Sequence, residues 1–284
     1  MIISVASGKG GTGKTTIATN LALSINRSVK LLDCDVEEPN AHLFIKPQIQ
    51  MSQTVYTWIP EIDEVLCNGC RKCAEICRFN ALTIVGSKVL VFPELCHSCQ
   101  GCLAVCPEDA VKEGSRELGV LETGTKEKLT FIQGTMRVGE AMSPPLIRQV
   151  RSKIDEGDLV IIDAPPGTSC PVITAIKDTD FVLLVTEPTP FGLHDLRLAV
   201  EAVKVLEIPC GIVVNRSDIG DRSVHAYAGQ ENIPILLEIP FDRRIAETYS
   251  HGRLLIEDYP TWRNTFEMLY RDIIEIIEAK QVAA

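Results

Sequence analysis

The feature that most constrains the fold of this chain is a glycine-rich loop between an apolar run and a helical stretch. Residues 8–15 read GKGGTGKT, which matches the pattern G-x4-G-K-T. Residues 2–6 are apolar enough for a buried strand, and apolar residues recur at helical spacing from 15 to 26. In that context glycines let backbone N–H groups approach phosphates, and the helix N-terminus adds positive potential. The chain is predicted to begin with a strand, a phosphate-binding loop and a helix.

Two side chains of this loop indicate a nucleoside triphosphate with magnesium. Lys14 is predicted to neutralise the terminal phosphates, and Thr15 to offer its hydroxyl to Mg²⁺. The alternative, a glycine-rich turn that binds nothing, fits poorly with a complete motif between a strand and a helix. The loop residues predicted to contact ATP or ADP are Gly8, Lys9, Gly10, Gly11, Thr12, Gly13, Lys14, Thr15 and Thr16.

Short, nearly continuous apolar runs along the rest of the chain indicate further buried strands. Continuous rather than alternating runs are expected for strands covered on both faces of a parallel sheet. Helical stretches such as 193–206 separate several of these runs, and the spacing in 262–279 predicts a final helix packed on the sheet. We therefore expect an α/β fold with a doubly wound, mostly parallel sheet. The runs occupy 29–32, 129–133, 159–162, 181–185, 212–214 and 235–239.

Cysteines gather in one segment that interrupts this pattern. The chain has 11 cysteines, and eight of them form two successive runs of the pattern C-x2-C-x2-C-x3-C. Three evenly spaced thiolates can wrap around one corner of a 4Fe-4S cluster, while the fourth points away and ligates the other cluster. One cluster is therefore assigned to Cys67, Cys70, Cys73 and Cys106, and the other to Cys96, Cys99, Cys102 and Cys77.

Structural zinc is the competing interpretation of these runs, because zinc also takes four thiolates. Zinc ribbons usually pair two CxxC knuckles across a longer stretch, which is not the spacing found here. Residues 61–117 are therefore predicted to be an inserted ferredoxin-like domain with two 4Fe-4S clusters and a hairpin turn at 86–87. The nucleotide-binding domain is then expected to be divided into residues 1–60 and 118–284.

Carboxylates stand at the ends of two predicted strands. Asp33 follows the run 29–32, and Asp163 follows the run 159–162. The carboxyl ends of parallel strands meet at one edge of the sheet, where the phosphate loop also lies. Plain solvation of the strand ends is the alternative, but two carboxylates at this edge are better explained by a magnesium site.

A second lysine, Lys9, makes the loop resemble the deviant Walker A loop of the superfamily of MinD, ParA, Mrp and the nitrogenase iron protein. The segments 33–35 (DCD) and 163–167 (DAPPG), together with Asn215, fall where that superfamily has its other motifs. The cysteine segment is similar to bacterial two-cluster ferredoxins. The whole chain thus resembles the MinD-superfamily ATPases that contain a ferredoxin.

This resemblance implies a role for each matching residue. Lys9 would reach across a dimer interface to the partner's ATP, and Asp35 would orient or deprotonate the attacking water. Asp33 would help to hold Mg²⁺ together with Thr15, and Asp163 would be the Walker B carboxylate. Lys9, Lys14 and Asp35 are then the catalytic residues. The further ATP-binding residues are Gly167, Asn215 on the adenine edge and Pro240 in the adenine pocket.

Three cysteines lie outside the cysteine segment. Cys34 and Cys210 are interpreted as packing residues. Cys170 lies at the position of a cluster ligand in the nitrogenase iron protein, whose second ligand has no counterpart here. A two-thiolate metal site across a dimer and a plain buried thiol both stay open for Cys170.

Charge and hydropathy limit the partners. The net charge of −10 disfavours a nucleic-acid partner, which requires cations facing phosphates. No apolar run is long enough for a membrane span, and the polar face of the final helix is largely acidic, so no membrane partner is expected. The first residues contain no basic leader, so a cytoplasmic location is expected.

Two functions compete at this point. In the first, an ATP-dependent homodimer gates electron transfer through two 4Fe-4S clusters to an unknown redox partner. In the second, the protein is an ATP-dependent iron–sulfur or metal carrier, or an assembly factor, for an unknown client protein. Eight thiolates in the ferredoxin arrangement favour the first function. Both functions make the chain an ATPase that requires Mg²⁺.

Overall fold

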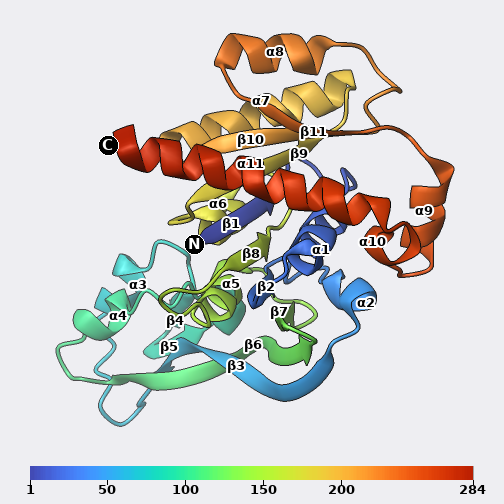
Figure 1. Ribbon diagram of the computed structural model, residues 1–284. Helices are drawn as coiled ribbons and strands as arrows, with labels where there is room; N and C mark the ends of the chain where they lie inside the picture. Colours follow the sequence, from blue (N-terminus) through green and yellow to red (C-terminus); the bar gives the residue numbers. More distant parts are fainter. Residues whose placement is uncertain (284) are drawn as a thin grey trace.

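A nine-stranded sheet forms the centre of the computed structural model, which describes residues 1–283 (Figure 1). Its strand order is β11-β10-β9-β1-β8-β2-β7-β6-β3, and all neighbours from β11 to β7 are parallel. The parallel strands are β1 (Ile2–Ala6), β2 (Val29–Asp33), β7 (Leu129–Met136), β8 (Val160–Asp163), β9 (Phe181–Thr186), β10 (Cys210–Asn215) and β11 (Ile235–Ile239). The predicted α/β class with a mostly parallel sheet is confirmed.

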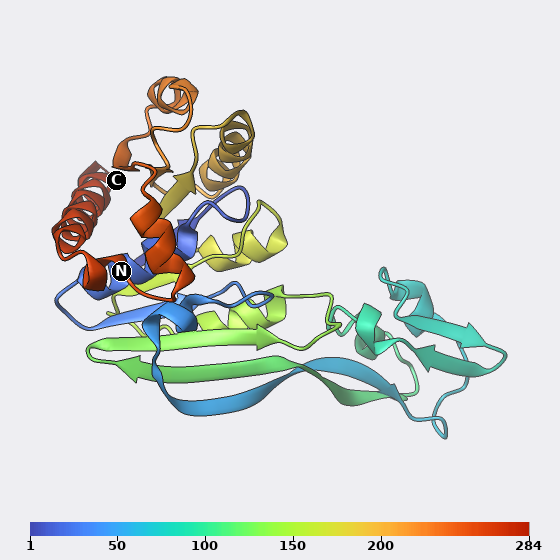
Figure 2. The same ribbon diagram turned by 90° about the vertical axis from the view of Figure 1, so that its right-hand side faces the viewer.

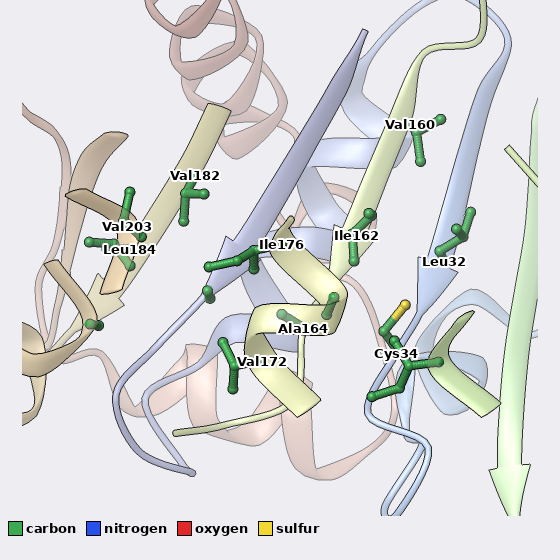
Figure 3. Close-up of a cluster of buried hydrophobic side chains, with 14 of the residues drawn as sticks. Leu32, Cys34, Val160, Ile162, Ala164, Val172, Ile176, Val182, Leu184 and Val203 are labelled. Carbon is green, nitrogen blue, oxygen red and sulfur yellow. The ribbon is translucent and has the colours of Figure 1, made fainter. Parts of the chain in front are cut away.

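Helices cover both faces of this sheet because successive strand residues point to opposite sides. Ile162 packs into one apolar core, and its neighbour Ile161 packs into the other. Figure 3 shows part of the first core, with Leu32 and Ile162 on the neighbouring strands β2 and β8, and Val172 and Ile176 on α6. This face is covered by α5 (Pro144–Arg151), α6 (Cys170–Ile176), α7 (Pro190–Val205) and α8 (Ser223–Glu231). The other is covered by α1 (Lys14–Ser24), α2 (Ala41–Ile45), α10 (Leu255–Asp258) and α11 (Thr261–Ala283).

The last helix, α11, packs against the sheet as predicted. Phe266, Leu269 and Ile273 lie in the second core, and α1 and α11 are in contact. The short α9 (Arg243–Ser250) connects β11 to this region. Among the described residues, every helix is too short or too polar to span a membrane.

Two long strands extend the sheet beyond its parallel part. β3 (Gln48–Ile62) and β6 (Val111–Lys126) pair antiparallel, and β6 also pairs antiparallel with β7. We call residues 56–62 and 111–118 the arm, because they continue past the end of β7 and carry residues 63–110 away from the helical layers (Figure 2). At the base of the arm Val55 pairs with Gly119 but Tyr56 pairs with Glu117, so Leu118 is an extra residue that forms a β-bulge.

The cysteine segment at the tip of the arm consists of short elements. They are α3 (Lys72–Ile76), β4 (Leu82–Val85), β5 (Lys88–Val91), a 3₁₀ turn (Pro93–Leu95) and α4 (Gly101–Ala104). β4 and β5 pair antiparallel across Gly86, which has a positive φ of 65°, so the predicted hairpin is confirmed. The limits predicted for the insert, 61 and 117, each fall inside a strand of the main sheet. The division into separate domains stays a prediction.

Candidate functional site

The phosphate loop connects β1 to α1 at the carboxyl edge of the sheet. Gly11 and Gly13 have φ values of 77° and 98°, a region that side chains disfavour. A Cβ on Gly13 would lie 2.7 Å from Nδ2 of Asn215, which donates a hydrogen bond to the carbonyl of Thr12 at 2.8 Å. Asn215 at the end of β10 therefore fixes the loop, and glycine is needed at position 13 for two reasons.

A cavity of about 1230 Å³ opens in front of this loop. The predicted residues Gly10, Gly11, Gly13, Lys14, Thr15, Thr16, Asp35, Asn215 and Pro240 line it. Gly8, Lys9, Thr12, Asp33, Asp163 and Gly167 are not among its lining residues. Sequence reasoning missed Arg216, Phe241 and Tyr249, which extend the cavity beyond Asn215 and Pro240. The first two follow predicted residues directly, and that adjacency was the available signal.

Asp33 and Asp163 stand on neighbouring strands, paired in register and fully buried. The carboxylate of Asp33 accepts hydrogen bonds from the backbone N–H groups of Asp35, Asn40 and Ala41 at 3.0–3.1 Å. Burial, and then the charge of Asp163, raises the pKa of Asp33 well above its usual value. Asp33 therefore also acts as a structural cap for the turn that leads into α2.

Asp163, unlike Asp33, can still accept hydrogen bonds or bind a cation. Both its oxygens lack a hydrogen-bond partner of normal geometry within the described chain, although the hydroxyl of Thr15 is close enough to lower the pKa of this acid. Burial is the largest effect and raises the pKa of Asp163 to about 7, against the opposing influence of Thr15 and Lys14. The carboxylate of Asp163 is buried next to Thr15 and has no hydrogen-bond partner of its own among residues 1–283. A Mg²⁺ ion bound there would supply the missing positive charge.

Asp35 lines the nucleotide cavity at the point where β2 ends. Burial raises the pKa of Asp35 to about 6, while the charge of Lys14 and the N–H of Glu38 lower it, and the neighbouring Glu37 and Glu38 raise it. A carboxylate with a pKa near the working pH is suited to accept a proton from water.

We expect the pH dependence of ATP hydrolysis to report the ionisation of Asp35. Because kcat/KM reports the ionisation of the free enzyme, kcat/KM should fall about tenfold per pH unit below about pH 6 if Asp35 is the base. The Asp35→Asn variant should be inactive at every pH. An acid limb that stays level down to pH 5 would contradict this role for Asp35.

Lys9 is held by an acidic residue that sequence reasoning missed. Nζ of Lys9 lies 3.5 Å from Oε2 of Glu187, and Nη1 of Arg216 lies 2.7 Å from Oε1 of the same carboxylate. The Glu187 side chain is only 8% exposed, whereas that of Lys9 is 33% exposed. Glu187 directly follows the buried strand β9, so its signal was a carboxylate at the end of a strand, as for Asp33 and Asp163.

The eight clustered cysteines line two cavities at the tip of the arm. One cavity is lined by Cys67, Cys70 and Cys73 of the first run and by Cys106 of the second. The other cavity is lined by Cys96, Cys99 and Cys102 of the second run and by Cys77 of the first. We call these the first and second thiol cavities. The structure thus brings together the two sets of four that the sequence analysis proposed, including the exchange of the fourth cysteine.

Burial makes several thiols of the two cavities harder to ionise. Burial raises the pKa of Cys73 and Cys96, and raises the pKa of Cys102 to about 11, so these thiols are protonated without a cation. A zinc ion requires thiolates that converge at about 2.3 Å on one point. In residues 1–283 no group of three cysteine, histidine or acidic side chains meets the requirements for a single metal ion.

The remaining cysteines differ from one another. Cys34 is fully buried in the first core (Figure 3), and burial raises its pKa strongly, so it is the predicted packing residue. Cys210 packs against the same core, and burial raises its pKa to about 11. Cys170 is exposed at the first turn of α6, so the interpretation of Cys170 as a buried thiol is wrong.

Comparison with known proteins adds a family to this geometry. A model of the CobQ/CobB/MinD/ParA nucleotide binding domain matches residues 3–256. An uncharacterized protein of Methanocaldococcus jannaschii is 32% identical over 279 residues, which are 96% of this chain and 98% of that protein. The iron–sulfur cluster carrier protein of the same organism is 26% identical over 98% of this chain and 86% of its own length.

The solved structure of the septum site-determining protein MinD from Pyrococcus horikoshii, complexed with Mg-ADP, has the same fold. It superposes with a TM-score of 0.60 at 20% identity and covers 100% of this chain and 98% of that one.

Proposed function

Because this chain belongs to the CobQ/CobB/MinD/ParA nucleotide-binding family and is an ATPase, we propose that it is an ATP-dependent carrier of iron–sulfur clusters for a client protein. The observation that carries this proposal is the pair of thiol cavities at the tip of the arm, each lined by four cysteines. A relative that spans nearly the whole chain is named an iron–sulfur cluster carrier protein, which supports the same role.

The cargo proposed for each cavity is one 4Fe-4S cluster. Residues 61–117 would then act as an inserted two-cluster ferredoxin-like domain, with the first cluster held by Cys67, Cys70, Cys73 and Cys106 and the second by Cys96, Cys99, Cys102 and Cys77. Cys70 and Cys99 are exposed, so each cavity has one thiol that a client can reach. Thiolate exchange at an exposed ligand is a chemically accessible route for transfer.

The ATPase part of the proposal assigns roles around the nucleotide cavity. Lys14 and the loop N–H groups bind the phosphates, Thr15 and Asp163 hold Mg²⁺ with Asp33 behind them, and Asp35 activates the water. Asn215, Pro240 and Phe241 bound the end of the cavity where adenine would lie. ATP would join two copies of the chain, so that Lys9 of each contacts the nucleotide of the other.

Iron content measured on cysteine variants tests the two-cluster assignment. Anaerobically reconstituted Cys67→Ala and Cys106→Ala proteins should each lose about half of the iron, because each removes a ligand of the first cavity. The double variant of these two residues should lose no more than either single variant. Combining Cys67→Ala with Cys77→Ala should instead remove nearly all iron. If the double variants show the reverse pattern, the exchange of the fourth cysteine is wrong.

ATP-gated electron transfer is a second candidate function. It rests on the burial of thiols such as Cys73 and Cys102 in the two cavities, because buried thiolates hold a cluster that stays bound. Transfer to an apo-ferredoxin, followed by visible absorbance after desalting, separates the two functions. In the carrier, Mg-ATP should accelerate loss of iron to the apo-ferredoxin, and Asp35→Asn should remove that acceleration. If iron stays bound and Mg-ATP changes only the reduction potential, the carrier proposal fails and gating replaces it.

A further inference from the structure

A buried arginine lies between the second thiol cavity and the nucleotide site. Arg116 of β6 pairs through Nη1 with Glu140, and the two side chains are 6% and 0% exposed. Nε and Nη2 of Arg116 have no hydrogen-bond partner in the described part of the chain. A buried guanidinium with only one of its donors in use has capacity for a second anionic partner.

Hydrogen bonds connect Thr57, the strand neighbour of Arg116, to Cys96 of the second thiol cavity. Arg116 pairs in register with Thr57 of β3, so the two side chains share one face of the ribbon. The hydroxyl of Thr57 is hydrogen-bonded to that of Ser98 at 2.7 Å, and the N–H of Ser98 donates to Sγ of Cys96 at 3.4 Å. The positive charge of Arg116 correspondingly lowers the pKa of Cys96, against the larger effect of burial.

The other partner of Arg116 organises the loop that follows β7. One oxygen of Glu140 accepts the N–H groups of Ala141 and Met142 at 3.1 Å, while the other accepts from Arg116. The loop 137–143 is thus folded around a carboxylate whose charge is balanced by the arm. Removing that balance would leave a buried carboxylate with an uncompensated charge, which destabilises this arrangement of the loop.

The residues where β7 passes into this loop are joined to the turn that follows β2 and to β6. The N–H of Met136 donates to the carbonyl of Val36 at 2.8 Å, and the N–H of Arg137 donates to the carbonyl of Leu118 at 2.8 Å. Val36 is buried directly after Asp35, which lines the nucleotide cavity. The N–H of Glu140 donates to the carbonyl of Arg137 at 3.1 Å, and Arg137 directly follows Met136. Side-chain and backbone links therefore lead from the Arg116–Glu140 pair to Val36, the neighbour of Asp35.

We propose that the Arg116–Glu140 pair couples the filling of the second thiol cavity to the nucleotide site. This inference rests on the proposed function, because it requires an iron–sulfur cluster in that cavity. A cluster with its thiolates adds negative charge beside Arg116, which competes with Glu140 for the guanidinium. Filling the cavity then loosens the loop 137–143, and this shifts the backbone at Val36 and the position of the Asp35 carboxylate. By reciprocity, bound nucleotide changes the affinity of the cavity for its cargo.

The test measures the affinity for a non-hydrolysable ATP analogue with Mg²⁺, on protein with and without reconstituted iron and sulfide. In the wild type the two affinities should differ by about 5-fold or more. In Arg116→Gln and in Glu140→Gln the difference should fall below about 2-fold, with iron content unchanged. Glu140→Gln is the milder variant, because its amide oxygen can still accept the N–H groups of Ala141 and Met142. Arg148→Gln is the matched control, because Arg148 is exposed on α5 and lines neither thiol cavity nor the nucleotide cavity.

A second readout separates charge coupling from a loss of structure. Arg116→Gln removes a positive charge from the second cluster and should lower its reduction potential, whereas Glu140→Gln leaves that charge unbalanced and should raise it. A general loosening of the fold would shift both variants in the same direction.

The outcomes are distinguishable from those for the proposed function. If the wild type takes up iron but its nucleotide affinity does not change on filling, or if both variants keep the full difference, the coupling inference is wrong while the carrier proposal stands. If the wild type takes up no iron, the carrier proposal fails, and this inference fails with it.

Discussion

Replacing Lys9 with alanine is expected to abolish ATP hydrolysis while nucleotide binding stays within a few-fold of the wild type. Lys14 lines the nucleotide cavity and Lys9 does not, so Lys9 contributes little to its own site. If Lys9 reaches the partner's phosphates, it acts as a cation supplied in trans, whose removal costs about 10³-fold or more in kcat. Steady-state turnover and titration with a fluorescent ATP analogue measure the two effects separately.

The environment of Lys9 makes this variant interpretable. Glu187 keeps its ion pair with Arg216 after Lys9 is removed, so the buried carboxylate is not left alone and the fold should be retained. Lys14→Ala is the matched control and should lose binding as well as turnover. Normal turnover by Lys9→Ala, or equal loss of binding in the two variants, would remove the cross-subunit mechanism.

Replacing Asp163 with asparagine is expected to stabilise the nucleotide-free protein and to abolish hydrolysis at the same time. Because burial raises the pKa of Asp163 to about 7, the folded state binds a proton in a pH range where the unfolded chain has released it. Its stability therefore falls as pH rises from about 4 to about 7, and the full penalty applies above pH 7. Asparagine has no charge to desolvate, so the variant should gain up to about 4 kcal/mol at pH 8.

Thermal unfolding at pH 5 and pH 8 measures this effect. The gain of Asp163→Asn over the wild type should be large at pH 8 and small at pH 5, and Mg-ADP should stabilise the wild type far more than the variant. Asp33→Asn is an informative contrast, because an amide has only one oxygen for the three N–H groups that Asp33 serves. The Asp33→Asn variant should therefore gain much less stability at pH 8 than Asp163→Asn. Equal unfolding temperatures for Asp163→Asn and wild type at both pH values would show that Asp163 carries no buried charge.

The parallel part of the fold followed from local sequence signals. Each apolar run predicted as a strand, from 2–6 to 235–239, overlaps a strand of the sheet, since a strand covered on both faces has to be apolar throughout. The superfamily membership expected from the Walker A loop is confirmed by the family match over residues 3–256. These signals are short-range and do not depend on distant partners.

The two long antiparallel strands did not follow from the sequence. Most of the first half of β3 is exposed, and its polar residues give no continuous apolar run. β6 was divided between the expected insert and the following domain, because its first residues come directly after the last cysteine run. What holds these strands is their pairing with each other and with β7, which is a long-range property.

At the candidate sites, too, local spacing in the sequence predicted some features, while others depend on long-range contacts. The grouping of the cysteines into 3 + 1 sets could be proposed from spacing alone, because the ligand geometry of a cluster is encoded in that spacing. Glu187 and Arg116 could not be found in this way. Each is significant because it is buried and pairs with a residue 24 or more positions away in the chain, and neither property is visible in a motif.

The arm has a mechanical consequence. Val111 lies eight residues beyond Gly119 along β6, a distance of about 26 Å at the usual rise of about 3.3 Å per residue. The bulge at Leu118 bends the ribbon at its base, next to the close approach of Gly119 to the carbonyl of Thr135, so a bend of the arm would have its pivot there. A rotation of only about 5° at that pivot would swing the far end by about 2 Å. The length of the arm would thus amplify a small change of bend at its base into a larger displacement of the two thiol cavities at its tip.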